Sequence, residues 1–594
     1  MNDKTETRFE RCVNFGAAIL VLLACAMAMS PSVADPDLWG HVQYGFDVLD
    51  TGEISETTTY SYTAEGYRWI NHENLSEIVM ALTVRYLGTT GLLLGKFLLS
   101  LLVIGSIVWF NLRQKVSLAA TSLLALLVAA NLGYHWSFRP QLSSFVLFTM
   151  LILLVQLSFA NWRDRWNIPQ LFSGVMGRDE AGSRVEQSWF NARLLWLAPV
   201  ILVVWTNSHG GYVAGVCIFI AYLVCRAFEA FCVKGTAGKG LILRMGLMAT
   251  VAGLVTLINP YSFRLPLWLL ESLGSPRPEI SDWSSGELFS LVGAKFWVLL
   301  AVVVFAFAYS KKSLDFTQMV VLAVTLWQAV SHFRHVPFFA ILCGFWLGPH
   351  LSSALARLQS AKSDQQTPFA FTGQRQILAG LAMLFVFCLL SFSLYGRLTQ
   401  LKVDRQRFPV DAFEYIASED LGRGQKIVVT YDWAQYTIAA FCCPDENGSA
   451  PSRVAFDGRF RTCYPQEVVD MHFDFLFGDQ GKRHRSPTSP PIDPARVLRH
   501  GNPDLVVLER VGELTEEHMN QQKSDWVLLY QDSLAQVWGS RQKFDNPNSL
   551  KYRPPSRRNI SNRIPTGYAD WPAMPKKNSL AKTKNTPEIA GKIN

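Results

Sequence analysis

The sequence carries little charge for its length. Asp, Glu, Lys and Arg make up 17% of its 594 residues, whereas 49% are hydrophobic, and an ordinary soluble domain has about 25% charged residues. It also lacks the signatures of several enzyme classes, since it contains no GxxxxGK[ST] phosphate loop, no HExxH helix and no paired CxxC motifs. These absences argue against a P-loop nucleotide hydrolase, a zinc metalloprotease and a zinc ribbon.

Cysteine is sparse and scattered, with ten residues in the whole chain. Three of them, Cys442, Cys443 and Cys463, fall in the C-terminal part, where one disulfide would leave one thiol unpaired. The formal net charge of +8 comes from short loops between apolar blocks and from the C-terminal end. It therefore does not predict a nucleic-acid-binding surface.

Long apolar blocks dominate the first 400 residues. They run for roughly 16–22 residues each, close to the length that crosses a hydrocarbon core about 30 Å thick. We therefore expect a polytopic α-helical membrane protein of about eleven transmembrane helices with a C-terminal α/β domain. The predicted spans are 13–30, 90–110, 117–134, 141–160, 194–208, 211–231, 242–258, 291–309, 316–331, 336–354 and 376–396.

Lys and Arg in the short connections predict the orientation, because cytoplasmic loops are enriched in these residues. With the N-terminus inside, the inner connections hold most of the cations, and the C-terminal domain is extracytoplasmic. Segment 74–87 is interpreted as an interfacial helix, since a further span would move the basic loops outside. We expect the protein in the cytoplasmic (inner) membrane. The inner cations are Arg113, Lys115, Arg163, Arg165, Arg178, Arg184, Arg193, Lys234, Lys239, Arg244, Lys311, Lys312, Arg357, Lys362 and Arg375.

The first apolar block has a second interpretation. A basic N-terminal region precedes it and Ser32-Val33-Ala34 follows it, which is the arrangement of a cleaved secretory signal. Cleavage after Ala34 would leave ten spans and would still place Asp35 outside. We favour retention, because the block is long for a signal peptide and the other spans already anchor the chain.

The expected domain organisation has three parts. Residues 1–400 form the transmembrane domain, which includes a first external loop at 31–89; residues 401–542 form a small extracytoplasmic α/β domain; and residues 543–594 form a disordered tail. The Pro-rich basic segment 478–494 is expected to be a mobile loop. In the α/β domain the patterns predict helices at 410–418, 465–477 and 514–522 and strands at 426–431, 453–456, 504–508, 526–530 and 535–538.

Polar motifs gather at the outer ends of the predicted spans. The most informative is Asp35-Pro36-Asp37, which with His41 follows the first apolar block. Ionisable groups beside lipid are costly unless they meet water, a metal or a polar substrate. Helix capping is the alternative role for these carboxylates. The other outer motifs are Asn71-His72-Glu73, Arg139-Pro140-Gln141, Asn207-Ser208-His209, Asn259-Pro260-Tyr261 with Arg264, Asp282-Trp283, and His332 with Arg334 and His335.

Two of these motifs favour function over structure. Gly210 and Gly211 after His209 permit a tight turn and a close approach of the backbone to another group. The cations around Arg334 lie on a face where the charge rule disfavours them, and they suit an anionic partner such as a phosphate. A lipid headgroup is the alternative partner there.

Other motifs have structural alternatives of equal or greater weight. His72-Glu73 can cap the helix that follows, and Arg139 can anchor the interface. In the α/β domain, Asp457-Gly458-Arg459 predicts a turn with a solvated ion pair; the alternative is that Arg459 or Trp433 faces the membrane cavity and holds an acceptor.

In their order along the chain, these motifs resemble those of the GT-C superfamily of integral-membrane glycosyltransferases. Within this superfamily the chain more closely resembles bacterial multispan proteins that are similar to lipopolysaccharide-core glycosyltransferases and to protein O-mannosyltransferases, and the similarity covers roughly residues 13–540. It rests on the strings Asp37-Leu38-Trp39, Arg139-Pro140-Gln141, Trp205-Thr206-Asn207-Ser208-His209-Gly210-Gly211 and Asn259-Pro260-Tyr261.

The resemblance implies transfer of a sugar from a polyprenyl-phosphate carrier to a glycan, lipid or protein acceptor outside the membrane, with membrane lipid as a further partner. Asp35 or Asp37 would accept the proton of the acceptor hydroxyl, and basic residues would stabilise the departing phosphate. No cofactor is certain: some members bind a divalent cation, for which Asp35, Asp37, His72 and Glu73 are the candidates, and no metal is assigned. The substrate-binding candidates are His41, His72, Glu73, Arg139, Gln141, Asn207, His209, Arg264, Arg334 and His335.

Two hypotheses from other classes remain. A transporter or flippase of a lipid-linked glycan would need similar contacts, and a noncatalytic envelope protein would need no chemistry at all. Transporters often show paired repeats and polar groups near the membrane midplane. Here the polar motifs gather at one face and no convincing repeat is visible, which favours the enzyme.

Overall fold

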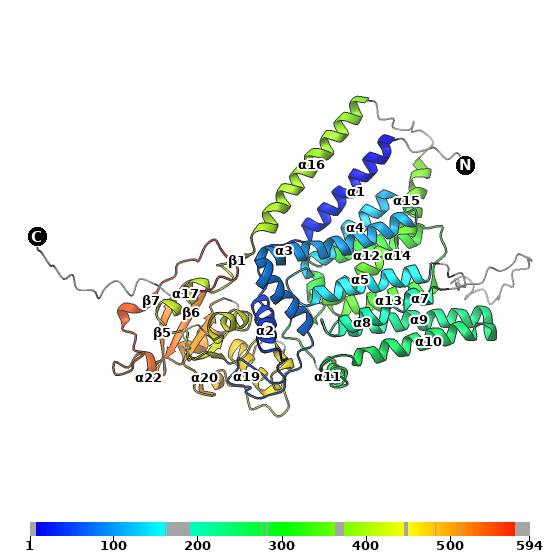
Figure 1. Cartoon of the computed structure of the whole chain (residues 1–594). Coiled ribbons are helices and arrows are strands. Elements are labelled where there is room, and N and C mark those ends of the chain that lie inside the picture. Colours follow the sequence, from blue (N-terminus) through cyan, green and yellow to red (C-terminus); the bar gives the residue numbers. More distant parts are fainter. Residues whose placement is uncertain are drawn as a thin grey trace, which may run out of the picture. The chain divides into compact units, whose positions relative to one another are not determined.

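The structure is a computed structural model, and it describes residues 8–160, 162, 190–274, 276–280, 283–362, 373–444, 450–480, 483–511 and 514–576. The chain divides into two compact units. The helical unit comprises Met1–Ser32 and His72–Gln400, and the sheet unit comprises Val33–Asn71 and Leu401–Asn594. Figure 1 shows the chain coloured along its sequence.

The helical unit contains the long apolar segments. Its elements are α1 (Arg8–Ala28), α3 (Asn74–Arg113), α4 (Leu118–Leu132), η1 (Gly133–His135), α5 (Gln141–Ser158), α7 (Ala192–Leu195), α8 (Ala198–Thr206), α9 (Tyr212–Lys234), η2 (Gly235–Gly238), α10 (Lys239–Leu254), η3 (Val255–Leu257), α11 (Arg264–Leu273), η5 (Gly286–Phe289), α12 (Ala294–Tyr309), α13 (Phe316–Ser331), η6 (Phe333–His335), α14 (Val336–Trp346), α15 (Gly348–Lys362) and α16 (Gly373–Thr399).

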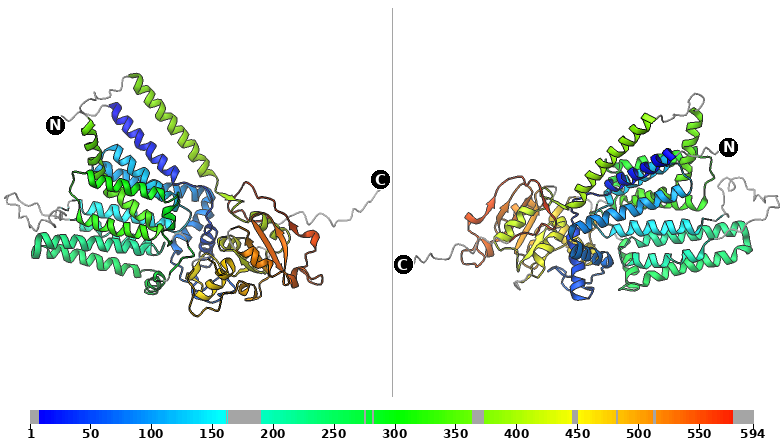
Figure 2. Two further views of the ribbon diagram at one scale, coloured as in Figure 1. Left: turned by 180° about the vertical axis from the view of Figure 1, so that it is seen from behind. Right: turned by 45° about the horizontal axis from the view of Figure 1, so that its top comes forward.

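Six helical segments of the described residues are long and apolar enough to cross a membrane, or seven if the pair Phe333–Trp346 and Gly348–Ser360, bent by 62°, is one span. Three further apolar segments are shorter: Ala192–Thr206, Ala294–Tyr309 and Phe316–Ser331. A helical membrane protein with a C-terminal sheet region is therefore confirmed, whereas the count of about eleven spans stays a prediction. One of the six candidate membrane-spanning segments is Tyr212–Leu257. It contains two helices, α9 and α10, which pack side by side (Figures 1 and 2).

Local signals set several helix boundaries in this unit. The α3 segment is interrupted at Gly88, where φ is 64° and ψ is −163°, a conformation that favours glycine. The part before Gly88 corresponds to the segment 74–87 that was predicted as a separate helix. Ser117 caps α4 by accepting from the Ala120 N–H, and Asp315 caps α13 by accepting from the Gln318 N–H.

The sheet unit is an α/β arrangement with a mixed sheet. Its elements are α2 (Leu38–Thr51), β1 (Lys402–Asp404), α17 (Val410–Ser418), β2 (Lys426–Val429), η7 (Tyr431–Trp433), α18 (Ala434–Thr437), the π-helical turn η8 (Ile438–Cys442), β3 (Arg453–Val454), η9 (Phe460–Thr462), α19 (Gln466–Phe477), α20 (Arg496–Arg499), β4 (Leu505–Glu509), α21 (Thr515–Asn520), β5 (Trp526–Gln531), β6 (Ala535–Ser540), α22 (Arg541–Phe544), η10 (Pro555–Arg557), β7 (Asn559–Ile560) and β8 (Tyr568–Asp570).

Six strands form the main sheet in the order β3-β2-β4-β6-β5-β7. The strand β2 pairs in parallel with β3 and β4, whereas β6 pairs antiparallel with β4 and β5. The central strand β4 is buried at four of its five residues, as a near-continuous apolar run predicts for a strand covered on both faces. The strands and helices expected at 410–538 agree with α17, β2, β3, α19, β4, α21, β5 and β6 in position.

The segment Val33–Asn71 belongs to the sheet unit, although the sequence analysis placed it in a loop of the transmembrane domain. Hydrogen bonds join it to the C-terminal segment: the Val454 N–H donates to Tyr60 O at 2.8 Å, and the Ile70 N–H donates to Thr462 O at 3.2 Å. Trp39 is buried and stacks on Tyr436 with ring centroids 4.7 Å apart. Backbone pairing and aromatic packing therefore bind this segment to residues that follow it by about 400 positions.

The end of the chain also differs from expectation, because residues 543–576 have a defined conformation rather than disorder. The strand β7 pairs in parallel with β5, and β8 pairs antiparallel with β1. Trp571 is buried, and its N–H donates to Leu401 O at 2.9 Å. Polar composition predicted disorder, but these strands satisfy their backbone groups against the sheet unit. Residues 577–594 lie outside the described residues.

The segment 478–494, expected to be a mobile loop, is folded where it is described. Two buried carboxylates of α19 hold it. Asp470 accepts from the Ser486 N–H at 2.8 Å, and Asp474 pairs with Arg483 at 3.1 Å and with Arg485. The carboxylates of Asp470 and Asp474 thus hold this Pro-rich segment in place of backbone hydrogen bonds to a strand.

Candidate functional site

The Asp35-Pro36-Asp37 motif forms a tight turn at the start of α2 in the sheet unit. The Asp37 N–H donates to Asp35 Oδ1 at 3.0 Å, and the Leu38 N–H donates to Asp35 O at 3.1 Å. Asp35 thus closes the turn with its carboxylate. Asp37 occupies the N-cap position but makes no side-chain cap hydrogen bond. Capping is therefore not the role of the Asp37 carboxylate.

Two glycines make room for side chains at the start of α2. A Cβ atom on Gly458 would lie 2.8 Å from Asp37 Oδ1 and 2.8 Å from Gln435 Nε2, and a Cβ atom on Gly40 would lie 1.7 Å from Gln435 Oε1. Gln435 is fixed in turn by the Tyr44 hydroxyl, which donates to Gln435 Oε1 at 2.7 Å. The start of α2 is therefore closely fitted to the turn that follows β3.

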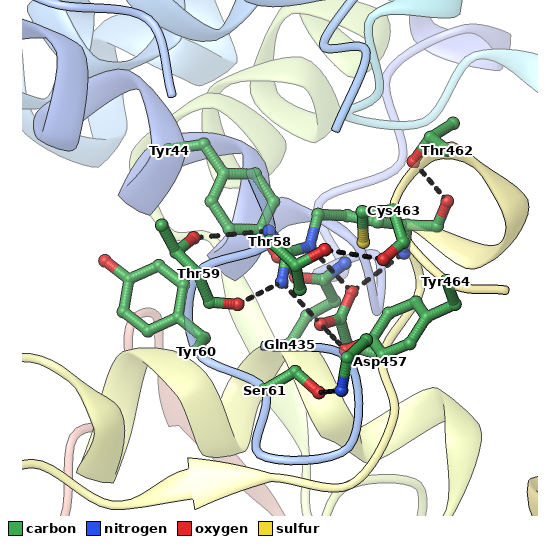
Figure 3. A network of polar contacts seen from close by, with 12 residues as sticks. Tyr44, Thr58, Thr59, Tyr60, Ser61, Gln435, Asp457, Thr462, Cys463 and Tyr464 are labelled. Atoms are coloured by element: carbon green, nitrogen blue, oxygen red, sulfur yellow. Dashed lines mark hydrogen bonds and ion pairs between the residues drawn. The ribbon is translucent and has the colours of Figure 1, made fainter. Parts of the chain in front are cut away.

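A buried ion pair lies behind this turn, and Figure 3 shows the contacts around it. Arg459 donates from Nε to Asp457 Oδ1 at 2.9 Å and from Nη2 to Asp457 Oδ2 at 2.8 Å. The side chains are 5% and 0% exposed, respectively. Asp457 also accepts from the Tyr464 hydroxyl at 2.6 Å. The expected solvated ion pair is thus wrong, because both groups are buried.

Arg459 also holds the segment 33–71. Its Nη2 donates to Thr59 O at 2.7 Å, and its guanidinium carbon lies 4.8 Å from the Tyr44 ring centroid and 4.6 Å from the Trp69 ring centroid. A guanidinium between two aromatic rings is stabilised by cation–π attraction. The contacts of Arg459 are therefore structural ones within the sheet unit.

In the helical unit, His209 is the centre of a polar cluster that we call the His209 cluster: Glu73, Ser144, Trp205 and His209. The Trp205 Nε1–H donates to Ser144 Oγ at 2.7 Å, and Ser144 Oγ lies 2.7 Å from His209 Nδ1. The Gly211 N–H donates to the same Nδ1 at 3.0 Å. An Nδ1 that accepts from a backbone N–H carries no proton, so the neutral ring holds its proton on Nε2.

The Nε2 atom of His209 faces a carboxylate. It lies 3.5 Å from Glu73 Oε1, and His72 Nε2 lies 3.9 Å from the same oxygen. Glu73 therefore faces two imidazoles, and both histidine side chains are 13% exposed. Three predicted residues from distant parts of the sequence, His72, Glu73 and His209, are thus brought together where solvent still reaches them.

The glycines after His209 have the role that the sequence suggested. A Cβ atom on Gly211 would lie 2.5 Å from Ser144 Oγ and 2.9 Å from His209 Nδ1, and one on Gly210 would lie 3.0 Å from His72 Nε2. Asn207 serves the scaffold instead of the cluster. Its Nδ2 donates to Val203 O and Ile258 O, and its carbonyl accepts from the Leu75 N–H.

The same unit contains a second group of basic residues, Lys96, Arg139, Arg277 and Arg334, which we call the cationic cluster. Lys96 lies within α3, Arg139 precedes α5, Arg277 follows α11, and Arg334 is in η6. Arg277 and Arg334 each place their guanidinium carbon 4.5 Å from the Trp283 ring centroid. Arg334 and Arg139 both act electrostatically on the buried His135, as does His335. Gln141 supports this region by donating from Nε2 to His135 O at 2.9 Å.

Lys96 was missed by the sequence analysis. It is 3% exposed on α3, its ammonium contacts Pro31 O, and its Nζ lies 4.1 Å from the Phe138 ring centroid. A lysine inside an otherwise apolar block was the available signal, because buried charge in a membrane segment is costly without a partner. Phe138 directly precedes Arg139 in the chain, and we count Lys96 with the cationic cluster on the basis of its contact with Phe138.

The remaining predicted residues lie in several parts of the described structure. Arg264 is exposed at the first residue of α11. His41 lies in α2 of the sheet unit. Asp282 lies outside the described residues. The set proposed for a metal is split between the units, since Asp35 and Asp37 belong to the sheet unit and His72 and Glu73 to the helical unit.

No protein-family model matches the sequence, and no curated protein matches it. Solved structures do match. The oligosaccharyltransferase AglB of Archaeoglobus fulgidus, solved with an inhibitory peptide and a dolichol-phosphate, is 10% identical with a TM-score of 0.47, over 85% of this chain and 70% of that one. ArnT of Cupriavidus metallidurans in the apo state is 11% identical with a TM-score of 0.49, over 89% and 97%.

The mycobacterial arabinofuranosyltransferase AftD is 13% identical with a TM-score of 0.39, over 89% of this chain and 40% of that one. At 10–13% identity the likeness assigns no role to any residue, so the roles below are argued from the contacts of this chain.

Proposed function

We propose that the protein is a glycosyltransferase that moves a sugar from a polyprenyl-phosphate carrier to an acceptor at the outer face of the cytoplasmic membrane. The cationic cluster is the observation that carries the proposal. Lys96 is a buried ammonium on an apolar helix, and Arg139 and Arg334 stand at the ends of neighbouring apolar helices. Such a group suits a phosphate that is attached to a membrane-embedded chain.

The chemistry of transfer fits these residues. As the bond between the sugar and the carrier breaks, negative charge grows on the phosphate oxygen, and fixed guanidinium and ammonium groups stabilise that charge more in the transition state than in the ground state. The cationic cluster is held by aromatic rings and carbonyl groups. It therefore needs little rearrangement when the charge appears.

A base must take the proton of the acceptor hydroxyl. We assign this role to Asp37, because Oδ1 of Asp35 already accepts from the Asp37 N–H and closes the turn. The His209 cluster has a separate role in this proposal. An Nε2–H held by its fixed tautomer, beside the Glu73 carboxylate, offers a donor and an acceptor for sugar hydroxyls.

The proposal includes the membrane arrangement predicted from the basic loops. The N-terminus lies inside, about eleven helices cross the membrane, and the sheet unit is extracytoplasmic. The sugar and the acceptor are left at the level of their classes: a polyprenyl-phosphate-linked hexose or pentose, and a glycan, lipid or protein.

The test uses purified full-length protein in detergent with a panel of radiolabelled polyprenyl-phosphate sugars and extracts of envelope acceptors. Wild type should transfer label, Asp37→Asn should lose at least about 100-fold of the rate, and Arg334→Gln should lose about 10- to 100-fold. Arg113→Gln, at an exposed position at the end of α3, should transfer at the wild-type rate. Absence of transfer by wild type from every carrier would refute the proposal.

A further inference from the structure

The sheet unit contains a cluster of arginines that the proposed reaction does not use. The Asp474 carboxylate of α19 forms ion pairs with three arginines, Arg483, Arg485 and Arg496. The distance is 3.1 Å to Arg483 and 3.7 Å to Arg496, and Arg485 lies closer than either. Asp474 is 0% exposed, Arg483 is 7% exposed, and the other two arginines are each 20% exposed. The cluster is thus anchored in the core and open to solvent on one side.

The charges in this cluster do not balance. Three guanidinium groups face one carboxylate, and Asp470, the other buried carboxylate of the same helix, accepts from Ser486, Ser489 and Gln466. Counting both carboxylates still leaves one positive charge in excess. Buried or half-buried cations without a counterion are costly, so an external anion would stabilise this arrangement.

The donors also exceed the acceptors. Three guanidinium groups carry about fifteen N–H donors. Among the described residues, their acceptors are the two oxygens of Asp474 and the carbonyl oxygens of Gly478, Pro490 and Glu467. The buried atoms Arg483 Nη1, Arg496 Nε and Asp474 Oδ2 make no hydrogen bond there.

Arg496 is the least engaged of the three. Its Nη2 reaches Glu467 O only at 3.5 Å and Asp474 Oδ2 only at 3.7 Å. It begins α20, whereas Arg485 lies in the Pro-rich segment that precedes this helix. Two half-exposed guanidinium groups beside a buried third form the multidentate arrangement that planar forks use to hold phosphate oxygens.

We propose that Arg483, Arg485 and Arg496 form a phosphate-binding site on the sheet unit. Arg485 and Arg496 would contact the phosphate oxygens directly, and Arg483 would remain paired with Asp474 beneath them. The ligand is a phosphate group of a lipid headgroup or of a water-soluble phosphorylated molecule. The inference does not depend on the proposed glycosyl transfer, because it requires binding and no reaction.

The experiment measures binding of two probes to the full-length protein in neutral detergent at constant ionic strength, by ³¹P NMR titration. The probes are inorganic pyrophosphate and a short-chain phosphatidylglycerol. The Arg334→Gln background is used throughout to weaken phosphate binding at the cationic cluster. Saturable binding of at least one probe is expected, and the probe that binds identifies the source of the phosphate.

The double variant Arg485→Gln/Arg496→Gln should lose at least about tenfold in affinity, because charge-assisted hydrogen bonds are the strong ones. The matched control is Arg499→Gln on the same helix, whose side chain is 64% exposed and pairs with Asp493; its affinity should stay within about twofold of the background. Arg496→Gln alone keeps the tighter ion pairs of Asp474 and serves if the double variant does not fold.

Three results would overturn the site. The first is that neither probe saturates, and the second is that the double variant binds as the background does. The third is that Arg499→Gln weakens binding as much as the double variant, which would mean attraction to surface charge alone. Failure of glycosyl transfer with binding intact would refute the proposed function and leave this site standing.

Discussion

Replacing Arg459 by Gln should make the segment Val33–Asn71 detach from the rest of the sheet unit. The detached state should be populated far more than after a substitution that removes an exposed ion pair. After the substitution, the fully buried Asp457 carboxylate still accepts from the Tyr464 hydroxyl and from the backbone N–H of residue 459. Removing one partner of a buried ion pair costs about 3–5 kcal/mol. The lost cation–π contacts with Tyr44 and Trp69 add about 0.5–1 kcal/mol each.

A matched control exists in the same unit. Arg453 and Glu65 also join the segment 33–71 to the C-terminal part, at 2.6 Å, but they are 46% and 68% exposed. An exposed pair contributes about 1 kcal/mol or less. Arg453→Gln should therefore open the segment only a few-fold more often, whereas Arg459→Gln should do so about 100-fold or more, since 1.4 kcal/mol is a factor of ten.

Trypsin measures this opening directly, because Arg68 is the only Lys or Arg within residues 33–71. When closing is faster than cleavage, the rate of cleavage after Arg68 follows the population of the open state. Adding Asp457→Asn to Arg459→Gln should recover part of the loss, since the uncompensated charge is gone. If Arg459→Gln were cleaved no faster than Arg453→Gln, the structural role given to the buried pair would be refuted.

Three further predictions concern stability. Gly211→Ala should lower the thermal unfolding midpoint by the equivalent of about 1–3 kcal/mol, because the added Cβ overpacks against Ser144. Gly253→Ala is the control, since it has open space around it and should leave the midpoint unchanged. Equal midpoints of the two variants would contradict the close approach of Gly211 to Ser144. Burial, aided by Asp432, raises the pKa of Glu509 to about 7 from 4.5. The native state therefore binds more protons than the unfolded state between these values, and wild-type stability falls as pH rises through them. Glu509→Gln should be more stable than wild type by about 1–2 kcal/mol above pH 7 and equal below pH 4.5 in thermal unfolding; a constant difference at all pH values would count against this. Deleting residues 543–594 should destabilise the sheet unit by removing β7 and β8, and unchanged melting of that unit would contradict this.

Local patterns predicted the elements well, because a helix or a strand depends mainly on the residues within it. The apolar blocks of the first 400 residues contain the long helices, and the short apolar runs such as Leu505–Glu509 form strands. The role of the glycines after His209 could also be predicted, since a pair of glycines beside polar residues indicates a close approach of the backbone to another group.

Long-range partners could not be predicted from one sequence. The burial of Arg459 depends on Tyr44 and Trp69, which precede it by about 400 residues, and the local turn Asp457-Gly458-Arg459 gives no sign of them. For the same reason the segment 33–71 was placed with the transmembrane domain, although its hydrogen bonds go to the C-terminal strands.

The tail shows the limit of composition as a guide. Residues 543–576 are polar and rich in Asn, Pro, Lys and Arg, which is typical of disorder. Two short strands and the buried Trp571 are enough to hold them. Edges of an existing sheet supply the partners, so such a segment needs few apolar residues of its own.

The central claim is that the protein transfers a sugar from a polyprenyl-phosphate carrier with Asp37 as base and the cationic cluster at the phosphate. A single-turnover measurement with a doubly labelled carrier tests it most directly, by counting sugar on the acceptor against free polyprenyl phosphate. The account predicts equal amounts of the two products with wild type and a large common loss of both with Asp37→Asn. Release of polyprenyl phosphate without sugar on any acceptor, or unchanged transfer by folded Asp37→Asn, would contradict it.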